Sequence, residues 1–194
     1  MSSESHLQSW AMLLAGDVGG TKTFMGLFAR GASRPEAVDV RSYRTLDFPG
    51  LVALSTQFLR DAGASAADID AGGFGVAGPV TGTRAQLTNV PWIVDVEALR
   101  RELPIPRAHL LNDLEALAWS VPVLNHDETE VLRKGEPDPS GNAALIAAGT
   151  GLGIALLPNV GGRLVPRASE GGHADFAARN ADEQRLHAAL AREY

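Results

Sequence analysis

Glycines, threonines and a carboxylate gather in the stretch GDVGGTKT at residues 16–23. Glycines let backbone N–H groups approach a ligand closely, and the hydroxyls of Thr21 and Thr23 add donors, a combination suited to binding phosphate. Asp17 would repel a bare phosphate, so we expect Mg²⁺, or water bound to it, between the two. These residue types predict a site for a nucleotide with its metal ion. For this stretch alone, the alternative is a tight hairpin whose glycines serve only the turn.

A second glycine turn, GTGLG at residues 149–153, repeats this arrangement. Apolar runs flank both turns, at residues 13–15 and 24–28 around the first and at residues 143–148 and 154–157 around the second. The pattern predicts strand, turn and strand in both places. It differs from the Walker loop and the dinucleotide fingerprint, which open helices. The recurrence indicates an internal repeat, with two domains that face one phosphate chain.

Asp113 is the residue that we expect to act as a catalytic base. It follows the short apolar stretch at residues 108–111, which predicts a buried strand. Ligand sites of α/β sheets collect at the carboxyl ends of strands. The alternative role of Asp113 is to cap the helix that begins at Leu114, and both roles are compatible because a cap leaves one carboxylate oxygen free. Asn112 either hydrogen-bonds a polyol or only ends the strand.

Glu170 and His173 flank a pair of glycines in the loop SEGGH at residues 169–173. Because glycines let the backbone fold tightly, we expect both side chains to point toward one centre. The neighbouring carboxylate and glycines favour a functional role for His173, although a lone histidine is usually structural. No Ser/His/Asp triad can be argued from the order of residues alone.

Apolar periodicity predicts the elements that position these residues. Charged, proline-containing sequence at residues 124–142 predicts an exposed loop before the second glycine turn. Further strands are expected at residues 38–45, 69–76 and 84–88, and helices at residues 51–62, 95–103, 114–121 and 181–194.

Length and composition bound the class of protein. The 194 residues suffice for one large domain or one and a half ordinary ones, and the net charge of −6 argues against a nucleic-acid partner. The sequence contains no cysteine, which excludes disulfides, thiol catalysis and cysteine-based zinc sites and is compatible with the cytoplasm. The first sixteen residues have neither a basic region nor a long apolar run, so we expect no signal peptide and no membrane span.

Six motifs follow one another along the chain: GDVGGTKT at 16–23, GVAGPV at 75–80, LTNVPW at 87–92, LLNDLEA at 110–116, AAGTGLGIA at 147–155 and SEGGHADFA at 169–177. Taken together and in this order, the motifs resemble the bacterial glucokinase family. The resemblance implies an actin-like ATPase (ribonuclease H-like) α/β fold, with a small α/β domain and an incomplete larger one. We expect a tail at residues 1–10, the small domain at 11–111 and part of the large domain at 112–194.

The resemblance implies an activity and roles for single residues. The activity is the glycolytic phosphorylation of D-glucose by ATP with Mg²⁺ in the cytoplasm, with Asp113 as the general base and Asp17 near the metal. A cysteine-rich zinc site is typical of the related ROK kinases, so the absence of cysteine places the chain outside that group. The implied sugar ligands are Asn112, Asp113, Glu170 and His173, and the implied phosphate loops are Gly16, Asp17, Val18, Gly19, Gly20 and Thr21, then Gly149, Thr150 and Gly151.

The chain departs from the family pattern at its end. Family members continue beyond it with another sugar-binding glutamate, a glycine-rich adenine site and a helix that returns to the small domain. The sequence therefore resembles the first three-fifths of a glucokinase. The alternatives are a sugar-binding remnant or fragment without catalysis, a kinase for another hexose, or an ATPase of the superfamily without a sugar substrate. We expect uncovered apolar surface that promotes association, and a homodimer is one possible assembly.

Overall fold

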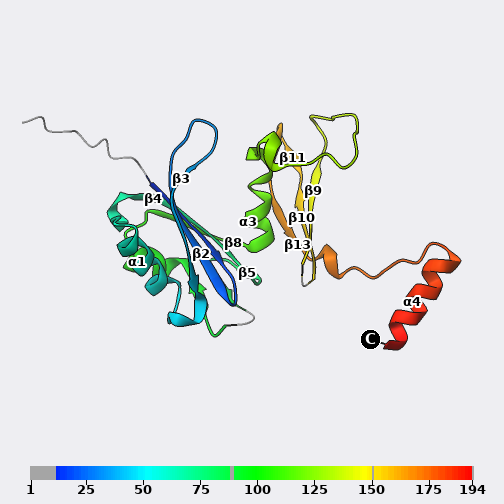
Figure 1. Ribbon diagram of the computed structural model, residues 1–194, viewed down its shortest axis with the longest axis horizontal. Coiled ribbons are helices and arrows are strands. Elements are labelled where there is room, and N and C mark those ends of the chain that lie inside the picture. Colours follow the sequence, from blue (N-terminus) through cyan, green and yellow to red (C-terminus); the bar gives the residue numbers. More distant parts are fainter. Residues whose placement is uncertain (1–11, 88–89, 150, 194) are drawn as a thin grey trace, which may run out of the picture.

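The computed structural model describes residues 12–87, 90–149 and 151–193 (Figure 1). The expected tail at residues 1–10 lies outside the described residues. So do Thr88 of the expected hairpin arm, Thr150 of the second glycine turn and Tyr194 of the expected last helix.

The first sheet has the strand order β3-β2-β1-β4-β8. β1 (Met12–Val18) and β2 (Lys22–Ala29) form the expected antiparallel hairpin, and β3 (Glu36–Arg44) pairs antiparallel with β2. β4 (Ile69–Val76) runs parallel to β1, and β8 (Arg107–Asn112) runs parallel to β4. The predicted strands are confirmed, with small shifts at their ends.

One detail of the first hairpin was wrongly predicted. Gly16 and Asp17 were expected in the turn, but they belong to β1, where they pair with Met25 and Phe24 of β2. The strands are long enough to include them, so the turn is confined to the residues between Val18 and Lys22. Asp17 is therefore held by a strand rather than by a loop.

Helices α1 (Leu51–Asp61) and α2 (Val96–Glu102) contact each other, and α2 also contacts β8. The apolar residues of α1 at helical spacing are buried in the main core together with those of the first sheet. α1 ends before Gly63, whose φ of 65° lies in the left-handed region that favours glycine. Asp95 caps α2, because its carboxylate accepts a hydrogen bond from the Glu97 backbone N–H at 2.9 Å.

The second sheet has the order β13-β10-β9. β9 (Ala143–Ala148) and β10 (Leu152–Leu157) form the second expected antiparallel hairpin, and β13 (Arg167–Ser169) pairs antiparallel with β10. Helix α3 (Asp113–Ala118) contacts β4 and β8 of the first sheet and every strand of the second (Figure 1). α3 is shorter than predicted, since its C-cap is Trp119, shortly before Pro122.

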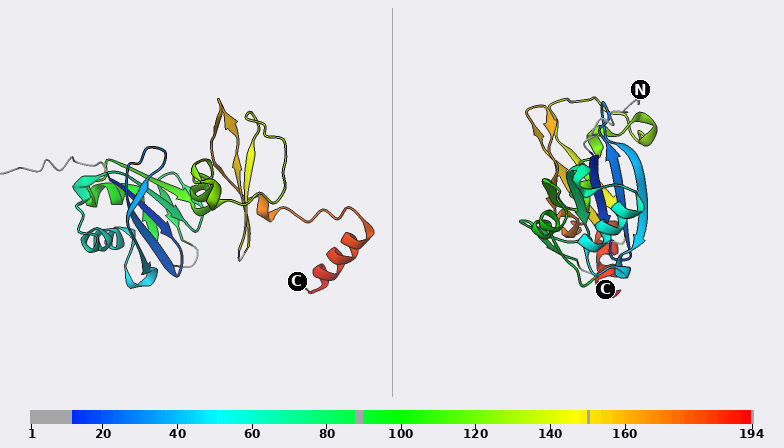
Figure 2. Two further views of the ribbon diagram at one scale, coloured as in Figure 1. Left: turned by 45° about the horizontal axis from the view of Figure 1, so that its top comes forward. Right: turned by 90° about the vertical axis from the view of Figure 1, so that its left-hand side faces the viewer.

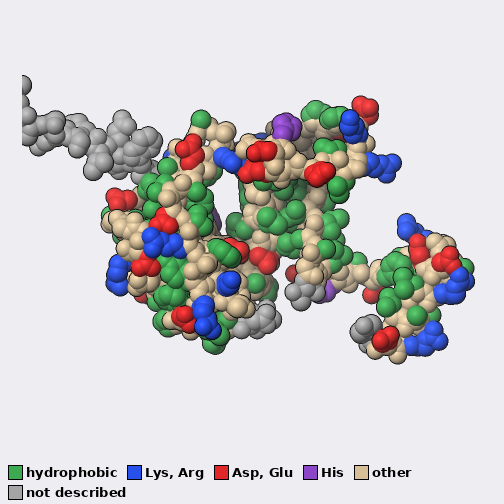
Figure 3. Space-filling model, viewed as in Figure 1, with side chains coloured by type: hydrophobic (Ala, Val, Ile, Leu, Met, Phe, Trp, Pro, Cys, Tyr) green, Lys and Arg blue, Asp and Glu red, His purple; other side chains and the backbone are tan. Residues whose placement is uncertain are grey.

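The last helix, α4 (Ala181–Glu193), projects from the end of an extended segment and lies apart from both sheets (Figures 1 and 2). None of its described residues is buried. Hydrophobic side chains reach the surface on α4 and over the second sheet (Figure 3). Among the described residues, no helix is long and apolar enough to cross a membrane.

Short elements complete the described ranges. The segment from Leu124 to Asn142 contains one 3₁₀ turn and is otherwise without helix or strand, as predicted. The short strands are β5 (Val80–Thr81), β6 (Arg84–Gln86) and β7 (Ile93–Asp95), which pair together, and β11 (Asn159–Val160) and β12 (Arg163–Leu164), which pair with each other. The 3₁₀ turns are η1 (Thr45–Asp47), η2 (Ala66–Asp68), η3 (Val121–Val123), η4 (His126–Glu128) and η5 (Gly171–His173).

Candidate functional site

The carboxyl ends of β1, β4 and β8 meet at one edge of the first sheet. Val18, Val76 and Asn112 lie in register there, because β4 pairs in parallel with both neighbours. The Ala77 N–H donates to the Val18 carbonyl at 3.2 Å and ties the segment after β4 to the end of β1. Parallel strands thus bring the glycine hairpin and the start of α3 to the same edge, as expected for a ligand site of an α/β sheet.

Asn112 rather than Asp113 caps α3, so the alternative role considered for Asp113, that of helix cap, was wrong. The Asn112 Oδ1 accepts hydrogen bonds from the N–H groups of Leu114 at 3.0 Å and Glu115 at 3.4 Å. Its Nδ2 donates to the Gly78 carbonyl at 3.4 Å. Asn112 therefore links the segment after β4 to the first turn of α3, and its amide is already engaged within the chain.

Asp113 is the first residue of α3 and is exposed. Its Oδ1 accepts the Leu114 N–H at 2.8 Å. No hydrogen bond from the described residues reaches Oδ2, which leaves that oxygen for a ligand. The carboxylate lies at the helix N-terminus, where negative charge is favourable.

Close packing at two glycines fixes the position of α3. A Cβ added at Gly75 of β4 would lie 2.9 Å from the Ala116 Cβ and 3.6 Å from the Asp113 Cα. On the opposite side, a Cβ at Gly153 of β10 would overlap the side chain of Leu114. The absence of side chains at both glycines lets α3 approach both sheets, and Asp113 is positioned by that approach.

A pocket of about 490 Å³ lies between the start of α3 and the second hairpin. It brings together the sugar-binding residues predicted from the sequence with Gly149 and Gly151 of the second glycine turn. Its described lining is Ala77, Asn112, Asp113, Leu114, Ala147, Gly149, Gly151, Leu152, Gly153, Ser169, Glu170, Gly172 and His173. This size and this polar lining suit a small polar ligand.

The Glu170 and His173 side chains meet at the rim of this pocket. The His173 Nε2 lies 3.6 Å from a carboxylate oxygen of Glu170, and both side chains are largely exposed. The tight turn that joins them depends on Gly172, where an added Cβ would overlap the Leu152 carbonyl. The expectation that the glycines bring the two side chains to one centre is met, with hydrogen-bonding capacity left for a ligand.

The first glycine loop is closed by the Gly19 N–H, which donates to the Lys22 carbonyl at 3.1 Å. Thr21 is exposed beside it. Thr23, however, was wrongly predicted as a phosphate donor. Its side chain is fully buried, and its hydroxyl lies 3.0 Å from the hydroxyl of Thr45.

Asp17 and Asp113 interact electrostatically across the sheet edge. Burial, and to a smaller extent the Asp113 carboxylate, raise the pKa of Asp17 above its ordinary value. A divalent cation close to Asp17 would offset that repulsion. Among the described residues, no three acidic or histidine side chains cluster as a metal cage. Asp17 fits a Mg²⁺ ion whose other ligands are phosphate oxygens and water, since Mg²⁺ is commonly held by one or two carboxylates together with substrate phosphates.

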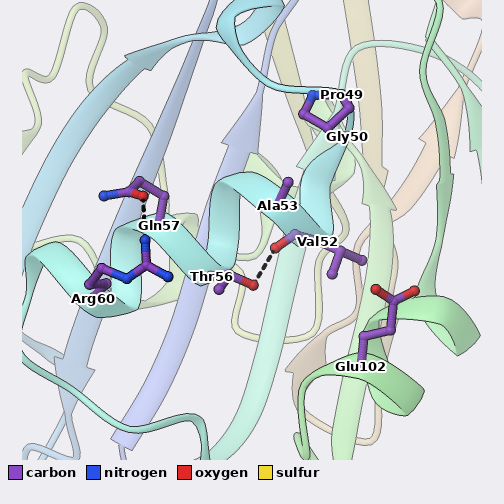
Figure 4. Close-up of a pocket in the computed structure, with 8 residues that line it drawn as sticks. All are labelled: Pro49, Gly50, Val52, Ala53, Thr56, Gln57, Arg60 and Glu102. Carbon is purple, nitrogen blue, oxygen red and sulfur yellow. Dashed lines mark hydrogen bonds between the residues drawn. The ribbon is translucent and has the colours of Figure 1, made fainter.

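Two other hollows lack this combination of groups. One of about 890 Å³ lies over β1 and β4 and is mostly apolar. The other, of about 460 Å³, runs along α1 toward Glu102 of α2 (Figure 4). There Thr56 donates to the Val52 carbonyl and Arg60 to the Gln57 side chain, so these polar groups are paired within α1. Neither hollow is lined by the predicted sugar-binding residues.

Sequence reasoning missed Thr45 and Gly78, which hydrogen-bond to residues of the site. Thr45 donates to the Gly19 carbonyl, and the Gly78 carbonyl accepts from Asn112. Thr45 was expected only as the end of a strand, and no motif distinguishes it. Gly78 lies in the motif GVAGPV, which carried the resemblance but was given no role. Both act through contacts with residues distant in the sequence, for which a single sequence holds no direct signal.

Comparison with known proteins gives consistent matches. The family model described as Glucokinase matches residues 14–194. A glucokinase from Nostoc punctiforme is 40% identical over 176 residues, which cover 90% of this chain and 51% of that protein. A glucokinase from Synechocystis is 36% identical over 190 residues, covering 93% of this chain and 54% of that protein. The chain thus spans about half the length of these curated relatives.

Solved structures agree in fold. The crystal structure of a glucokinase from an Antarctic psychrotroph matches with a TM-score of 0.83 at 24% identity, covering 95% of this chain and 58% of that one. A glucokinase from Balamuthia mandrillaris in complex with glucose matches with a TM-score of 0.64 at 21% identity, covering 93% and 54%. The fold is therefore the α/β fold of the actin-like ATPases that these sugar kinases share.

Proposed function

Since the chain belongs to the glucokinase family, we propose that it acts in the ATP-dependent phosphorylation of D-glucose at the 6-hydroxyl. The observation that carries the proposal is the 490 Å³ pocket, because Asn112, Asp113, Glu170 and His173 line it together with the second glycine turn. A sugar bound there would present its hydroxyls to the carboxylate and imidazole groups, and to the second hydrogen of the Asn112 Nδ2, since the first is donated to the Gly78 carbonyl.

Asp113 takes the role of general base. As the 6-hydroxyl oxygen attacks the γ-phosphorus of ATP, its proton moves to the free carboxylate oxygen of Asp113 and ADP leaves with the electrons of the broken P–O bond. Asn112 holds the first turn of α3 and thereby the Asp113 carboxylate, while Glu170 and His173 orient the sugar. Positioning of the two reactants supplies most of the remaining acceleration.

The glycine loops supply the phosphate site in this proposal. The turn that follows Gly16, Asp17 and Val18 of β1 contacts the phosphates, with the exposed Thr21 as a donor, and Gly149, Thr150 and Gly151 contact them from the second glycine turn. Asp17 holds Mg²⁺ through water, and the ion when bound supplies charge neutralisation on the phosphates. We place the division between the small and large domains at residues 111 and 112, and the reaction in the cytoplasm. The separate pairing of the two sheets supports the division.

A second candidate is sugar binding without phosphoryl transfer. It is favoured by one observation: the described lining of the pocket includes the sugar-binding residues and the second glycine turn, but not the first glycine loop. The chain also spans about half the length of its curated relatives. Both candidates use the same pocket, so they differ in turnover and not in sugar affinity.

The test is glucose-dependent ADP formation by the purified chain with Mg-ATP, beside calorimetric titration with glucose. Phosphorylation predicts ADP release that requires glucose, with mannose and fructose as competing substrates in the same assay. Glucose binding without ADP would favour the second candidate. A chain that binds none of these hexoses under either assay would contradict both.

A further inference from the structure

We infer that Thr45 is a positioning residue for the first glycine loop, and that its buried hydroxyl, with that of Thr23, holds the loop in the shape that binds nucleotide phosphate. The inference rests on the proposed function, because it assigns a support to the phosphate site proposed there. No motif of the sequence includes Thr45, and it lies outside every pocket described above.

Thr45 bonds to the loop twice. Its backbone N–H donates to the Thr21 carbonyl at 3.1 Å, and its Oγ1 donates to the Gly19 carbonyl at 2.8 Å. These carbonyls belong to the residues on either side of Gly20, so Thr45 links the two sides of the turn. Thr45 is 0% exposed, so water does not reach either of its two donor groups in the folded chain.

The direction of the hydrogen bonds follows from the number of hydrogens. A threonine hydroxyl carries one hydrogen, and that of Thr45 is used on the Gly19 carbonyl. The 3.0 Å contact between the two hydroxyls must then have Thr23 as its donor. The result is a directed chain from the Thr23 hydroxyl to Thr45 and on to Gly19. Linked hydrogen bonds of this kind polarise and strengthen one another in a water-free environment.

This arrangement bears on phosphate binding through the carbonyl oxygens. Because the Gly19 and Thr21 carbonyls are directed at Thr45, these partial negative charges are turned toward the core. A phosphate at the loop is therefore spared their repulsion. Gly19 needs its lack of side chain for this shape, since an added Cβ would lie 2.8 Å from the Lys22 carbonyl oxygen. Without the Thr45 hydroxyl, the Gly19 carbonyl loses its buried donor. We then expect it to rotate toward solvent, where water can donate to it.

The experiment compares Thr45→Val, which keeps the shape and removes the hydroxyl, with Thr45→Ser, which keeps the hydroxyl. Thr56→Val is the control, because the Thr56 hydroxyl donates to the Val52 carbonyl within α1 and not to the loop. Titrations with Mg-ATP and with glucose are run on each variant. Hydrogen exchange is followed for the segment 19–24 and for β4.

Thr45→Val should weaken Mg-ATP binding about tenfold, which corresponds to about 1.4 kcal/mol, and should speed exchange in the segment 19–24. Glucose affinity and exchange in β4 should stay as in the wild type. Thr45→Ser should recover most of the Mg-ATP affinity, and Thr56→Val should change neither property. Thr23→Val should have a smaller effect than Thr45→Val, since the bond to Gly19 survives.

Unchanged Mg-ATP affinity and unchanged exchange in Thr45→Val would overturn the inference while leaving the proposed function in place. Equal losses of Mg-ATP and glucose affinity in Thr45→Val, without recovery in Thr45→Ser, would also overturn it, because they indicate general damage. If the wild type binds glucose but no Mg-ATP, phosphorylation and this role of Thr45 fail together. The two failures are thus told apart by the wild-type titration.

Discussion

At the level of single residues, the fold disfavours the ionised form of Asp17. Asp17 lies one position before the end of β1, and partial burial together with the Asp113 carboxylate raises the pKa of its side chain. A raised pKa in the folded state means that the fold binds this proton more tightly than the unfolded chain does. Stability contributed by the group is therefore highest at low pH and falls as pH rises from the ordinary value of 3.8 through the raised value.

We predict that Asp17→Asn raises the melting temperature at pH 7, because it removes an ionised carboxylate from a site that disfavours it. The gain should vanish below pH 3.8, where the aspartate is protonated in both states. Thermal melts across this pH range check the prediction, with the exposed Asp127→Asn as control. A loss of stability at pH 7, or a gain that is equal at all pH values, would contradict it.

The sequence predicted which residue types lie at the site, but it did not predict which of two neighbouring residues of similar type takes which role. Asn112 and Asp113 are both good helix caps, so their order alone could not tell which one caps α3. Thr21 and Thr23 both looked like phosphate donors, but the turn ends between them and Thr23 points into the core. The partner that makes this visible, Thr45, lies 22 positions away from Thr23.

At the level of elements, α3 connects the two sheets and carries Asp113. Its contacts at Gly75 and Gly153 leave no room for side chains. The apolar periodicity predicted a helix here, but it could not show which faces would be covered. Small residues on distant strands determine that, and such pairings arise only when the chain is folded. The two hairpins were more predictable, because alternating apolar runs around glycines are local signals.

We predict that Gly75→Ala destabilises the fold by about 1–3 kcal/mol, the usual cost of overpacking. The added Cβ would press on Ala116 and shift α3. Gly73→Ala is the matched control on the same strand, since no described atom lies within 4 Å of a Cβ there. It should be neutral or slightly stabilising because alanine loses less backbone freedom on folding. Urea unfolding measures both, and equal stabilities of the two variants would refute this account of α3.

At the level of the whole molecule, apolar side chains remain uncovered on the second sheet and α4. Ile146, Leu152 and Leu156 of the second sheet and Leu186 and Leu190 of α4 are exposed. Contiguous exposed apolar surface commonly marks an interaction site or a tendency to associate. β9 also lies at an edge of its sheet, where unpaired backbone groups add to that tendency.

We predict that the chain self-associates through this sheet, and that Ile146→Lys increases the monomer fraction at a given concentration. Ile93→Lys is the control, because Ile93 is also an isoleucine of a short strand with the same exposure of 65% but lies with β7 on another sheet. Light scattering coupled to size exclusion reads the outcome. If both substitutions raise the monomer fraction equally, the change reflects a general gain in solubility, and the prediction of association through the second sheet is wrong.

Sequence reasoning reached the architecture of the whole molecule mainly through the order of the motifs, because strand order depends on long-range pairing. Local patterns indicated both hairpins and the main helices, but not that β4 lies between β1 and β8. That pairing brings Asp17 and Asp113 to one edge, and the site depends on it. The similarity to the curated relatives extends over about half of their length.

The central claim, that Asp113 is the base of a glucose-phosphorylating site, is tested most directly by Asp113→Asn. Asparagine retains an oxygen for the Leu114 N–H but cannot accept the hydroxyl proton. Glucose-dependent ADP formation should fall about 10²- to 10⁴-fold, the usual contribution of a positioned base, while the dissociation constant for glucose measured by calorimetry changes little. Near-normal turnover in Asp113→Asn, with Asp127→Asn as the reference, would contradict the account.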